Sequence, residues 1–352
     1  MNTCIQFFEI LSFYELVLIL TMDIAVVSGI SMEDFELVIL CGGGSSSERN
    51  ISLLSGENVF QHCKNAFRTR KIILERDELP DDVKKCGKNS VIFPLTHGEF
   101  GESGELQKMM EDCGLTFVGS DSKTSKLCMN KERTKQVVSN VGVPVIDGFK
   151  FKKNFLKDPS DIISKFGDKL FIKPNAKGSS IDVHPISSSE DFINVINSLD
   201  GDTEYLLEKK VFGYDVTVCL LNGKTLEIVN IRPKHEFFSY EDKYTAGMAD
   251  EICPADISDG LRRKISSCAE VAYKACGCRD LARADFVLTD DGDVYFLELN
   301  TLPGMTPVSL YPKSCAAAGL SIESLTKILI SSALSRRDNA KQFVMQEAEA
   351  FV

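Results

Sequence analysis

Two acidic residues near the C-terminal end of the sequence are predicted to face each other across a β-hairpin. Two apolar-rich runs flank the sequence Asp290-Asp291-Gly292-Asp293, which is typical of a tight turn. A two-residue turn at its centre, or a symmetric four-residue loop, pairs Asp285 with Glu298 and Arg283 with Asn300. Because side chains alternate along a strand, all four then lie on one face of the hairpin.

Carboxylates that oppose each other in this way destabilise a sheet unless a cation lies between them. A solvated acidic surface is the alternative, but Val287, Val294 and Phe296 are expected on the same face as Asp285 and Glu298. The other face is apolar as well, through Phe286, Leu288, Leu297 and Leu299. Since a hairpin buried on both sides does not hold unpartnered carboxylates, the pattern predicts a site for a hard divalent cation. Mg²⁺ suits it best, because this ion accepts one or two carboxylates together with substrate phosphates.

Basic residues beside small residues are candidates for phosphate binding. Lys173 ends an apolar strand, and Gly178-Ser179-Ser180 follows it, so that backbone N–H groups and hydroxyls can approach phosphate oxygens. Lys131 begins a helix, and the segment 42–47 precedes another helix, where an anion can bind. Glu48 would repel an anion there and suits an ammonium group instead. Neither a Walker A loop nor a Rossmann fingerprint is present, and each loop alone also fits a plain surface turn.

The composition is that of an ordinary globular protein rather than a disordered or fibrous one. The chain has 352 residues, of which 43% are hydrophobic and 26% are charged. Its 40 Lys and Arg against 51 Asp and Glu give a formal net charge of −11, which argues against a nucleic-acid partner. The charge does not exclude a nucleotide, because a few local Lys residues and backbone N–H groups are enough to hold one.

The segment 1–34 is predicted to be an N-terminal extension of unknown role. Its apolar stretch 5–30 is interrupted by Glu9, Glu15 and Asp23 and follows no Lys or Arg, unlike a signal peptide or a spanning helix. The 12 scattered Cys residues fit reduced, mostly buried thiols. The sequence therefore predicts a cytoplasmic protein with no membrane partner.

Strands and helices alternate in the first part of the chain. Strands are expected at 35–41, 70–74, 90–95 and 115–118. A capping-box pattern at 45–48 begins a helix that extends to about Lys64. Alternation of this kind predicts a parallel α/β layer.

The last part of the chain is predicted to contain two hairpins and a terminal helix. Asn222-Gly223 predicts a type I′ turn between strands at 216–221 and 224–231. The acidic hairpin follows, and a helix at about 322–334 ends the fold, with a frayed polar tail past Arg336.

The order of these elements predicts three domains of α/β and α+β character. A parallel α/β domain spans 35–128, after the extension 1–34. A smaller central unit spans 129–215, and a third unit that contains the acidic hairpin spans 216–340. Residues 341–352 are expected to form a tail.

Five blocks of sequence occur together in one order. The acidic hairpin continues through Pro303-Gly304-Met305-Thr306 to Ser309 and Leu310. The other blocks are Gly42-Gly43-Gly44 with Glu48-Arg49, Thr96-His97-Gly98 through Gly104, Lys173-Pro174 through Ser180, and Tyr240 with Lys243-Tyr244. Over about residues 35–335 this combination resembles the D-alanine–D-alanine ligases of the ATP-grasp superfamily. The resemblance implies a three-domain ATP-grasp architecture, with ATP between the central and C-terminal sheets.

The resemblance implies how a nucleotide and its metal ions would be held. Lys131 and Lys173 would contact the ATP phosphates, with Ser179 and Ser180 in a closing loop. The adenine and ribose would be framed by Glu208, Lys209, Val211 and Asp215. Two Mg²⁺ or Mn²⁺ ions would be bound by Asp285, Glu298 and Asn300. The segment 235–249, which carries Lys243, would close over the site.

The resemblance also implies a site for the first amino acid. Glu48 would hold the ammonium group of a D-alanine and would be linked by hydrogen bonds to Ser179 and Tyr244. His97 would lie near the carboxylate of the same substrate. ATP would convert that carboxylate to an acyl phosphate, because a free carboxylate is a poor acyl donor.

A second D-alanine would then attack the acyl phosphate to give D-alanyl-D-alanine, a precursor of peptidoglycan. The resulting oxyanion would be stabilised by Arg283 and the Gly304 backbone N–H, and the second D-alanine would be positioned by Ser309 and Leu310. Relatives of this kind are commonly homodimers, so the resemblance implies a homodimer.

Five positions depart from the family pattern, and these departures bear on affinity. Ile181-Asp182 stands where Val-Gly is usual, Asp215 where Glu is usual, Lys210 where an aromatic residue is common, and Ser103 where Asp is usual. None of these changes removes a residue with a proposed catalytic role.

Two alternative functions remain open at this point. A related ligase would make D-alanyl-D-lactate or D-alanyl-D-serine, although Lys243-Tyr244 favours the dipeptide over the depsipeptide. A catalytically inactive nucleotide-binding regulator is the other alternative, and the intact set of Arg283, Asp285, Glu298 and Asn300 argues against it.

Overall fold

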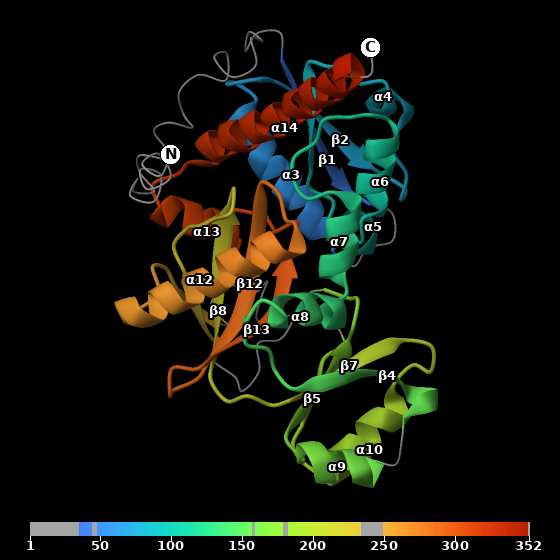
Figure 1. Cartoon of the computed structure of the whole chain (residues 1–352), viewed down its shortest axis with the longest axis vertical. Helices are drawn as coiled ribbons and strands as arrows, with labels where there is room; N and C mark the ends of the chain where they lie inside the picture. Colours follow the sequence, from blue (N-terminus) through green and yellow to red (C-terminus); the bar gives the residue numbers. More distant parts are fainter. Residues whose placement is uncertain (1–34, 44–47, 157–158, 179–181, 234–248, 351–352) are drawn as a thin grey trace.

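The computed structural model of the chain contains three β-sheets, arranged one after another along the long axis of the molecule (Figure 1). It describes residues 35–43, 48–156, 159–178, 182–233 and 249–350. The extension 1–34 and the serines of the expected capping box lie outside these residues.

The first sheet is parallel, as the alternating pattern predicts. Its order is β2 (Arg68–Leu74), β1 (Glu36–Gly42) and β3 (Ser90–Pro94). Helix α3 (Arg49–Cys63) packs on β1. The strand expected at 115–118 is reduced to a single parallel bridge between Phe117 and Ile92.

The middle sheet is antiparallel and contains the acidic hairpin. Its order is β11-β10-β8-β12-β13, and β9 pairs with β8. The bounds are β8 Tyr214–Leu221, β9 Lys224–Thr225, β10 Val229–Pro233, β11 Ala249–Ile252, β12 Leu281–Leu288 and β13 Val294–Asn300. The φ angles of Asn222 and Gly223 are 50° and 78°, so the predicted type I′ turn is confirmed. Helix α12 (Asp259–Cys276), which packs against this sheet, was not anticipated from the sequence.

The third sheet is smaller and also antiparallel. Its order is β4-β7-β5-β6, with bounds β4 Gly148–Lys152, β7 Glu204–Lys209, β5 Leu170–Pro174 and β6 His184–Ile186. Helices α9 (Pro159–Phe166) and α10 (Ser189–Ser198) lie beside it, and their apolar side chains share one core with the strands.

The acidic hairpin pairs Asp285 with Glu298 and Arg283 with Asn300, as predicted, but the turn that leads to this register differs from the predicted one. Its loop has three residues rather than two or four, because Thr289 pairs with Asp293, and this shifts the register by one residue. A β-bulge between Asp285 and Phe286 adds one residue, Leu297, to the partner strand and restores the pairing of Asp285 with Glu298.

The bulge also changes which side of the sheet the β13 residues between the turn and Leu297 face. Val294 and Phe296 are buried in the core on the side away from the carboxylates, which corrects the prediction that they share the acidic face. Val287 stays on the acidic face, and Leu297, expected on the opposite side, reaches the cavity described below.

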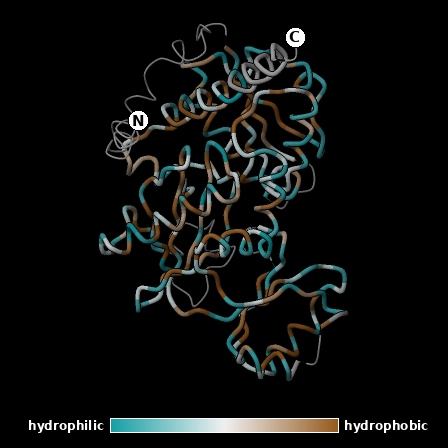
Figure 2. Tube along the Cα trace, in the orientation of Figure 1, coloured by the Kyte–Doolittle hydropathy of each residue, from teal (hydrophilic) through white to brown (hydrophobic). Residues whose placement is uncertain are grey.

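The C-terminal helix is longer than the sequence suggested. Helix α14 runs over Ile322–Ala350, so the tail expected to fray past Arg336 is its continuation. It packs against α3 and reaches β3 (Figure 1). Hydrophobic residues are concentrated along the strands beneath it (Figure 2).

Within the described residues, six shorter helices lie between the elements given above. They are α4 Asp81–Lys84, α5 Glu99–Glu102, α6 Glu105–Asp112, α7 Ser122–Met129, α8 Lys131–Ser139 and α13 Leu310–Ala317. The Cys residues in the described part of the chain are free thiols and most are buried, as expected. In these same residues no single helix has the length and apolar character needed to cross a membrane, and α13 with part of α14 meets that test only as a pair bent by 99°.

Candidate active site

A cavity of about 650 Å³ lies between the middle sheet and the smaller third sheet. It brings together all the candidate site residues in the described part of the chain: Glu48, His97, Lys131, Lys173, Glu208, Lys209, Val211, Asp215, Arg283, Asp285, Glu298, Asn300, Gly304, Ser309 and Leu310. The remaining candidates, Ser179, Ser180, Lys243 and Tyr244, lie outside the described residues.

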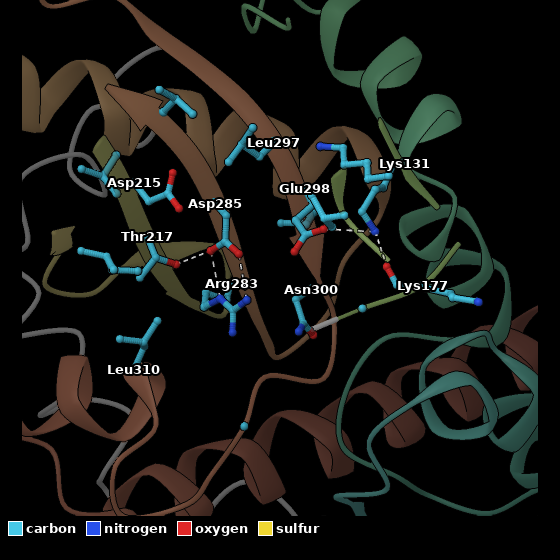
Figure 3. Close-up of a pocket in the computed structure, with 18 of the residues that line it drawn as sticks. Lys131, Lys177, Asp215, Thr217, Arg283, Asp285, Leu297, Glu298, Asn300 and Leu310 are labelled. Atoms are coloured by element: carbon cyan, nitrogen blue, oxygen red, sulfur yellow. Dashed lines mark hydrogen bonds and ion pairs between the residues drawn. The ribbon is translucent and has the colours of Figure 1, made fainter. Parts of the chain in front are cut away.

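Asp285 is held by an arginine on its own strand (Figure 3). Arg283 donates to it from Nε to Oδ1 at 2.9 Å and from Nη2 to Oδ2 at 2.8 Å. Burial alone would lower the pKa of Arg283, but the Asp285 carboxylate raises it above the ordinary value. The Thr217 hydroxyl, opposite Asp285 on β8, donates to the same carboxylate. Sequence reasoning missed Thr217, because its pairing with β12 joins strands far apart in the chain.

Glu298 is paired with a lysine from a different element. Lys131 begins α8, and its Nζ lies 3.2 Å from Glu298 Oε2 and donates to the Lys177 carbonyl at 2.6 Å (Figure 3). Asn130 caps this helix by accepting a hydrogen bond from the Arg133 N–H at 3.0 Å. The cap fixes the helix start and therefore the position of the Lys131 side chain.

The oxygen donors of the hairpin fit a metal ion that is shared with a ligand. Among the residues that the structure describes, no group of three or more His, Cys, Asp or Glu could hold a metal ion alone. The hairpin offers the carboxylates of Asp285 and Glu298 and the Asn300 amide oxygen, which also accepts from the Leu302 N–H at 2.8 Å. Because Mg²⁺ typically takes one or two carboxylates plus phosphate oxygens and water, this donor set suits a phosphate-bound Mg²⁺.

A buried carboxylate lies between two lysines at the opposite wall. Glu208 is 2% exposed; its Oε2 lies 2.7 Å from the Lys173 Nζ, and its Oε1 contacts Lys135. Burial lowers the pKa of Lys135, as do the charges of Lys173 and Lys131, whereas the charge of Glu298 opposes this shift. Lys135 was not among the predicted residues, although its i+4 spacing from Lys131 on α8 places both on one helix face.

The cavity wall beside β7 is aromatic and basic. Lys210 Nζ lies 5.8 Å from the centre of the Phe171 ring and 5.4 Å from that of Phe212, so its ammonium group lies near both rings. Cation–π contacts of this kind occur within about 6 Å. The departure from an aromatic residue at position 210 is therefore accompanied by two flanking aromatic rings.

Asp182, another departure, adopts a backbone conformation that favours Gly. Its φ is 60°, and its carboxylate contacts His184 Nε2 at 2.7 Å and accepts from the Tyr205 hydroxyl at 3.0 Å. Burial raises the pKa of Tyr205, and its hydrogen bond to Asp182 raises it further. These contacts offset the strain of a non-Gly residue at this position.

Glu48 and His97 lie at the end of the cavity formed by the first sheet and α3. Glu48 precedes the first residue of α3 and is 9% exposed. A Cβ on Gly178 would lie 3.6 Å from Glu48 Oε2, so the carboxylate is close to the last described residue before the segment 179–181. His97 is 3% exposed, and its Nδ1 lies 3.5 Å from Glu102 Oε1.

The fold and the cavity together define the class of protein. Two antiparallel sheets enclose a cavity lined by opposed carboxylates and several lysines, next to a parallel α/β layer, and this is the arrangement of an ATP-grasp ligase. The family profile described as D-ala D-ala ligase C-terminus matches residues 137–331. The chain belongs to the D-alanine–D-alanine ligase family.

Individual relatives agree with this assignment along most of the chain. The D-alanine–D-alanine ligase of Clostridium botulinum (strain Langeland) is 34% identical over 294 residues, which cover 83% of this chain and 96% of the relative. The protein of that name from Actinobacillus succinogenes is 33% identical over 303 residues, or 85% and 98% of the two chains.

Solved structures have the same fold. The Bacillus anthracis D-alanine–D-alanine ligase complexed with ATP matches with a TM-score of 0.75 and 29% identity, over 87% of this chain and 99% of that one. The VanG D-Ala:D-Ser ligase of Enterococcus faecalis matches with a TM-score of 0.72 and 28% identity, over 85% and 99%.

Proposed function

We propose that this ligase uses ATP to join two D-alanines into D-alanyl-D-alanine, for peptidoglycan precursor synthesis in the cytoplasm. The observation that carries the proposal is the pairing of Asp285 with Glu298 on one wall of a cavity whose other walls supply Lys131 and Lys173. Two opposed carboxylates with two nearby ammonium groups suit a metal-bound triphosphate.

In this proposal the nucleotide lies between the middle and third sheets. Lys131 and Lys173, with Ser179 and Ser180, would bind its phosphates. The base and ribose would lie along Glu208, Lys209, Val211 and Asp215, and Lys243 would approach from the segment 235–249. Asp285, Glu298 and Asn300 would hold two Mg²⁺ or Mn²⁺ ions, and bound metal would neutralise phosphate charge during transfer.

The amino acids would lie at the other end of the cavity. Glu48, with Ser179 and Tyr244, would orient the ammonium group of the first D-alanine, and His97 would lie near its carboxylate. Once that carboxylate is an acyl phosphate, the amine of the second D-alanine would attack it.

The chain would then stabilise the tetrahedral oxyanion. The Arg283 guanidinium and the Gly304 N–H line the cavity and would donate hydrogen bonds to it. Ser309 and Leu310 would position the second D-alanine, and phosphate would leave as the amide forms. We further propose that the enzyme acts as a homodimer.

Phosphate release measured with ATP and D-alanine as the only amino acid tests the reaction. We expect release and D-alanyl-D-alanine formation under these conditions. Release only after D-lactate or D-serine is added would instead support the depsipeptide or D-alanyl-D-serine ligase, and the resemblance to the VanG D-Ala:D-Ser ligase makes D-serine the alternative to include. No release with any of the three would support an inactive nucleotide-binding regulator.

Glu298→Gln tests the metal assignment. The change keeps the shape of the side chain but removes one of two metal-binding carboxylates, so we expect turnover to be lost while the circular dichroism spectrum is retained. Asp291→Asn, at the exposed turn of the same hairpin, is the matched control and should turn over like the unchanged protein. Undiminished turnover of Glu298→Gln would refute the metal assignment.

A further inference from the structure

Helix α3 holds a backbone segment that lies about 250 residues further along the chain. The Met305 N–H donates to Ser55 Oγ at 3.1 Å, and Asn58 Nδ2 donates to the Met305 carbonyl at 2.7 Å. Both polar backbone groups of one residue are therefore bound by side chains of one helix. Ser55 and Asn58 are three residues apart, which places them on the same helix face.

The residue held in this way follows Gly304, whose N–H is the proposed oxyanion donor. Met305 is fully buried in the core that α3 shares with α14, so its side chain anchors the segment as well. On the other side, the Thr306 N–H donates to Ser309 Oγ at 3.1 Å. A Cβ on Gly304 would lie 2.9 Å from the same Ser309 oxygen, so a side chain there would displace Ser309 or the loop.

The Ser55 hydroxyl also connects this segment to His97. Ser55 Oγ lies 3.0 Å from His97 Nε2, and both residues are almost completely buried. A serine hydroxyl has one proton and two lone pairs, so it can accept from Met305 and still donate to, or accept from, the imidazole. The Ser55 hydroxyl therefore contacts both His97, which is proposed to lie near the carboxylate of the first substrate, and the loop that carries the Gly304 N–H.

We propose that Ser55 and Asn58 are positioning residues that fix the Gly304 N–H where the tetrahedral oxyanion forms. The inference rests on the proposed function, and it extends that function to two residues that do not line the cavity. An oxyanion donor is effective only if it is held at the position where charge develops. Here the position is set by α3, whose N-terminal end also carries Glu48.

Ser55→Ala and Asn58→Ala test the proposal, each made separately in the full chain. Gln61→Ala is the matched control, because Gln61 is an exposed amide on the same helix. For each of the two variants we expect kcat for dipeptide formation to fall by about 10- to 100-fold, the range expected when a catalytic group is misplaced. The KM for ATP should stay unchanged, because the nucleotide contacts lie on other elements.

A measurement of the two chemical steps separates positioning from a merely structural role. ATP labelled with ¹⁸O in its β,γ-bridging position scrambles the label when the γ-phosphoryl group passes to D-alanine and returns. The Gly304 N–H acts on attack by the second amine, so the ratio of isotope exchange to dipeptide formation should rise in both variants. It should be the same in Gln61→Ala as in the unchanged enzyme.

A fall of exchange and turnover by the same factor, or kcat equal to that of the control, would overturn the inference. If the unchanged enzyme formed no dipeptide from D-alanine, the proposed function would fail instead, and the two failures are thus distinguishable. Ser55 is completely buried whereas Asn58 is half-buried, so Asn58→Ala carries the same test should Ser55→Ala not fold.

Discussion

A single arginine on α14 neutralises a carboxylate that is buried at the junction of the first and middle sheets. Asp280 is 3% exposed and accepts from Arg336 Nη1 at 2.6 Å and Nη2 at 3.0 Å. The Gly119 N–H donates to the same carboxylate at 2.7 Å. Arg336 donates to the Phe117 carbonyl at 3.0 Å as well, so it joins three separate parts of the chain.

Arg336→Met keeps most of the side chain's apolar length but leaves the Asp280 charge uncompensated. Removing one partner of a buried ion pair typically costs about 3–5 kcal/mol. We expect the lower end, about 3 kcal/mol, because the Arg336 side chain is 31% exposed and water can reach its place. At about 2–4 °C per kcal/mol, the midpoint of thermal unfolding should fall by about 6–12 °C.

The assay is thermal unfolding followed by circular dichroism, with Lys327→Met as the control. Lys327 lies on the same helix and pairs with Glu323 at 2.6 Å, but both side chains are about 40% exposed. A surface pair of this kind contributes less than about 1 kcal/mol. Adding Asp280→Asn to Arg336→Met should recover part of the loss, since no unpaired charge is then buried. An Arg336→Met midpoint equal to that of the control would refute the reasoning.

Three further outcomes follow from individual contacts. Asp182→Gly should be more stable than Asp182→Ala by about 1–2 kcal/mol. Both variants lose the contact with His184, but only the Ala variant keeps the strain of a positive φ. Equal unfolding midpoints of the two variants would contradict this. Asn230→Leu should raise the unfolding midpoint, since neither polar atom of this buried side chain meets a partner within the described residues; a lower midpoint would show that the amide is satisfied. Lys131→Met should weaken ATP binding. It should strengthen the binding of Mn²⁺ alone, because Glu298 loses the ammonium group that competes with the metal. Weaker Mn²⁺ binding in a titration would contradict the pairing of Lys131 with Glu298.

The sequence was sufficient to predict the parallel layer and the opposed carboxylates, because both follow from local patterns. The pairing of Asp285 with Glu298 was right only because two unpredicted features cancel, the three-residue loop and the bulge at Leu297. Neither has a clear local signal, since loop length and bulge position depend on how the hairpin packs. This is also why the faces of Val294 and Phe296 were wrong.

Residues that act through long-range contacts were missed. Ser55, Thr217 and Lys135 are ordinary helix or strand residues by spacing, and their importance depends on partners 68 to 250 positions away. Only the helical i+4 relation of Lys135 to Lys131 could have been noticed from the sequence. Motifs identify groups that meet the substrate, whereas the residues that position them are distinguished by the tertiary fold.

The charged groups of the cavity are paired with one another even though the chain as a whole is acidic. Asp285 contacts Arg283, Glu298 contacts Lys131, and Glu208 contacts Lys173. In the proposed reaction metal ions would take over Asp285 and Glu298, the phosphates would take over Lys131 and Lys173, and Glu208 would keep its contact with Lys135. The exchange keeps each of these charges compensated, which matters because an unpaired charge is costly where it is shielded from water. Metal and nucleotide should therefore bind together more readily than either binds alone. The metal supplies a cation to the carboxylates when phosphate draws the lysines away, and the phosphates supply an anion to the lysines when metal draws the carboxylates away.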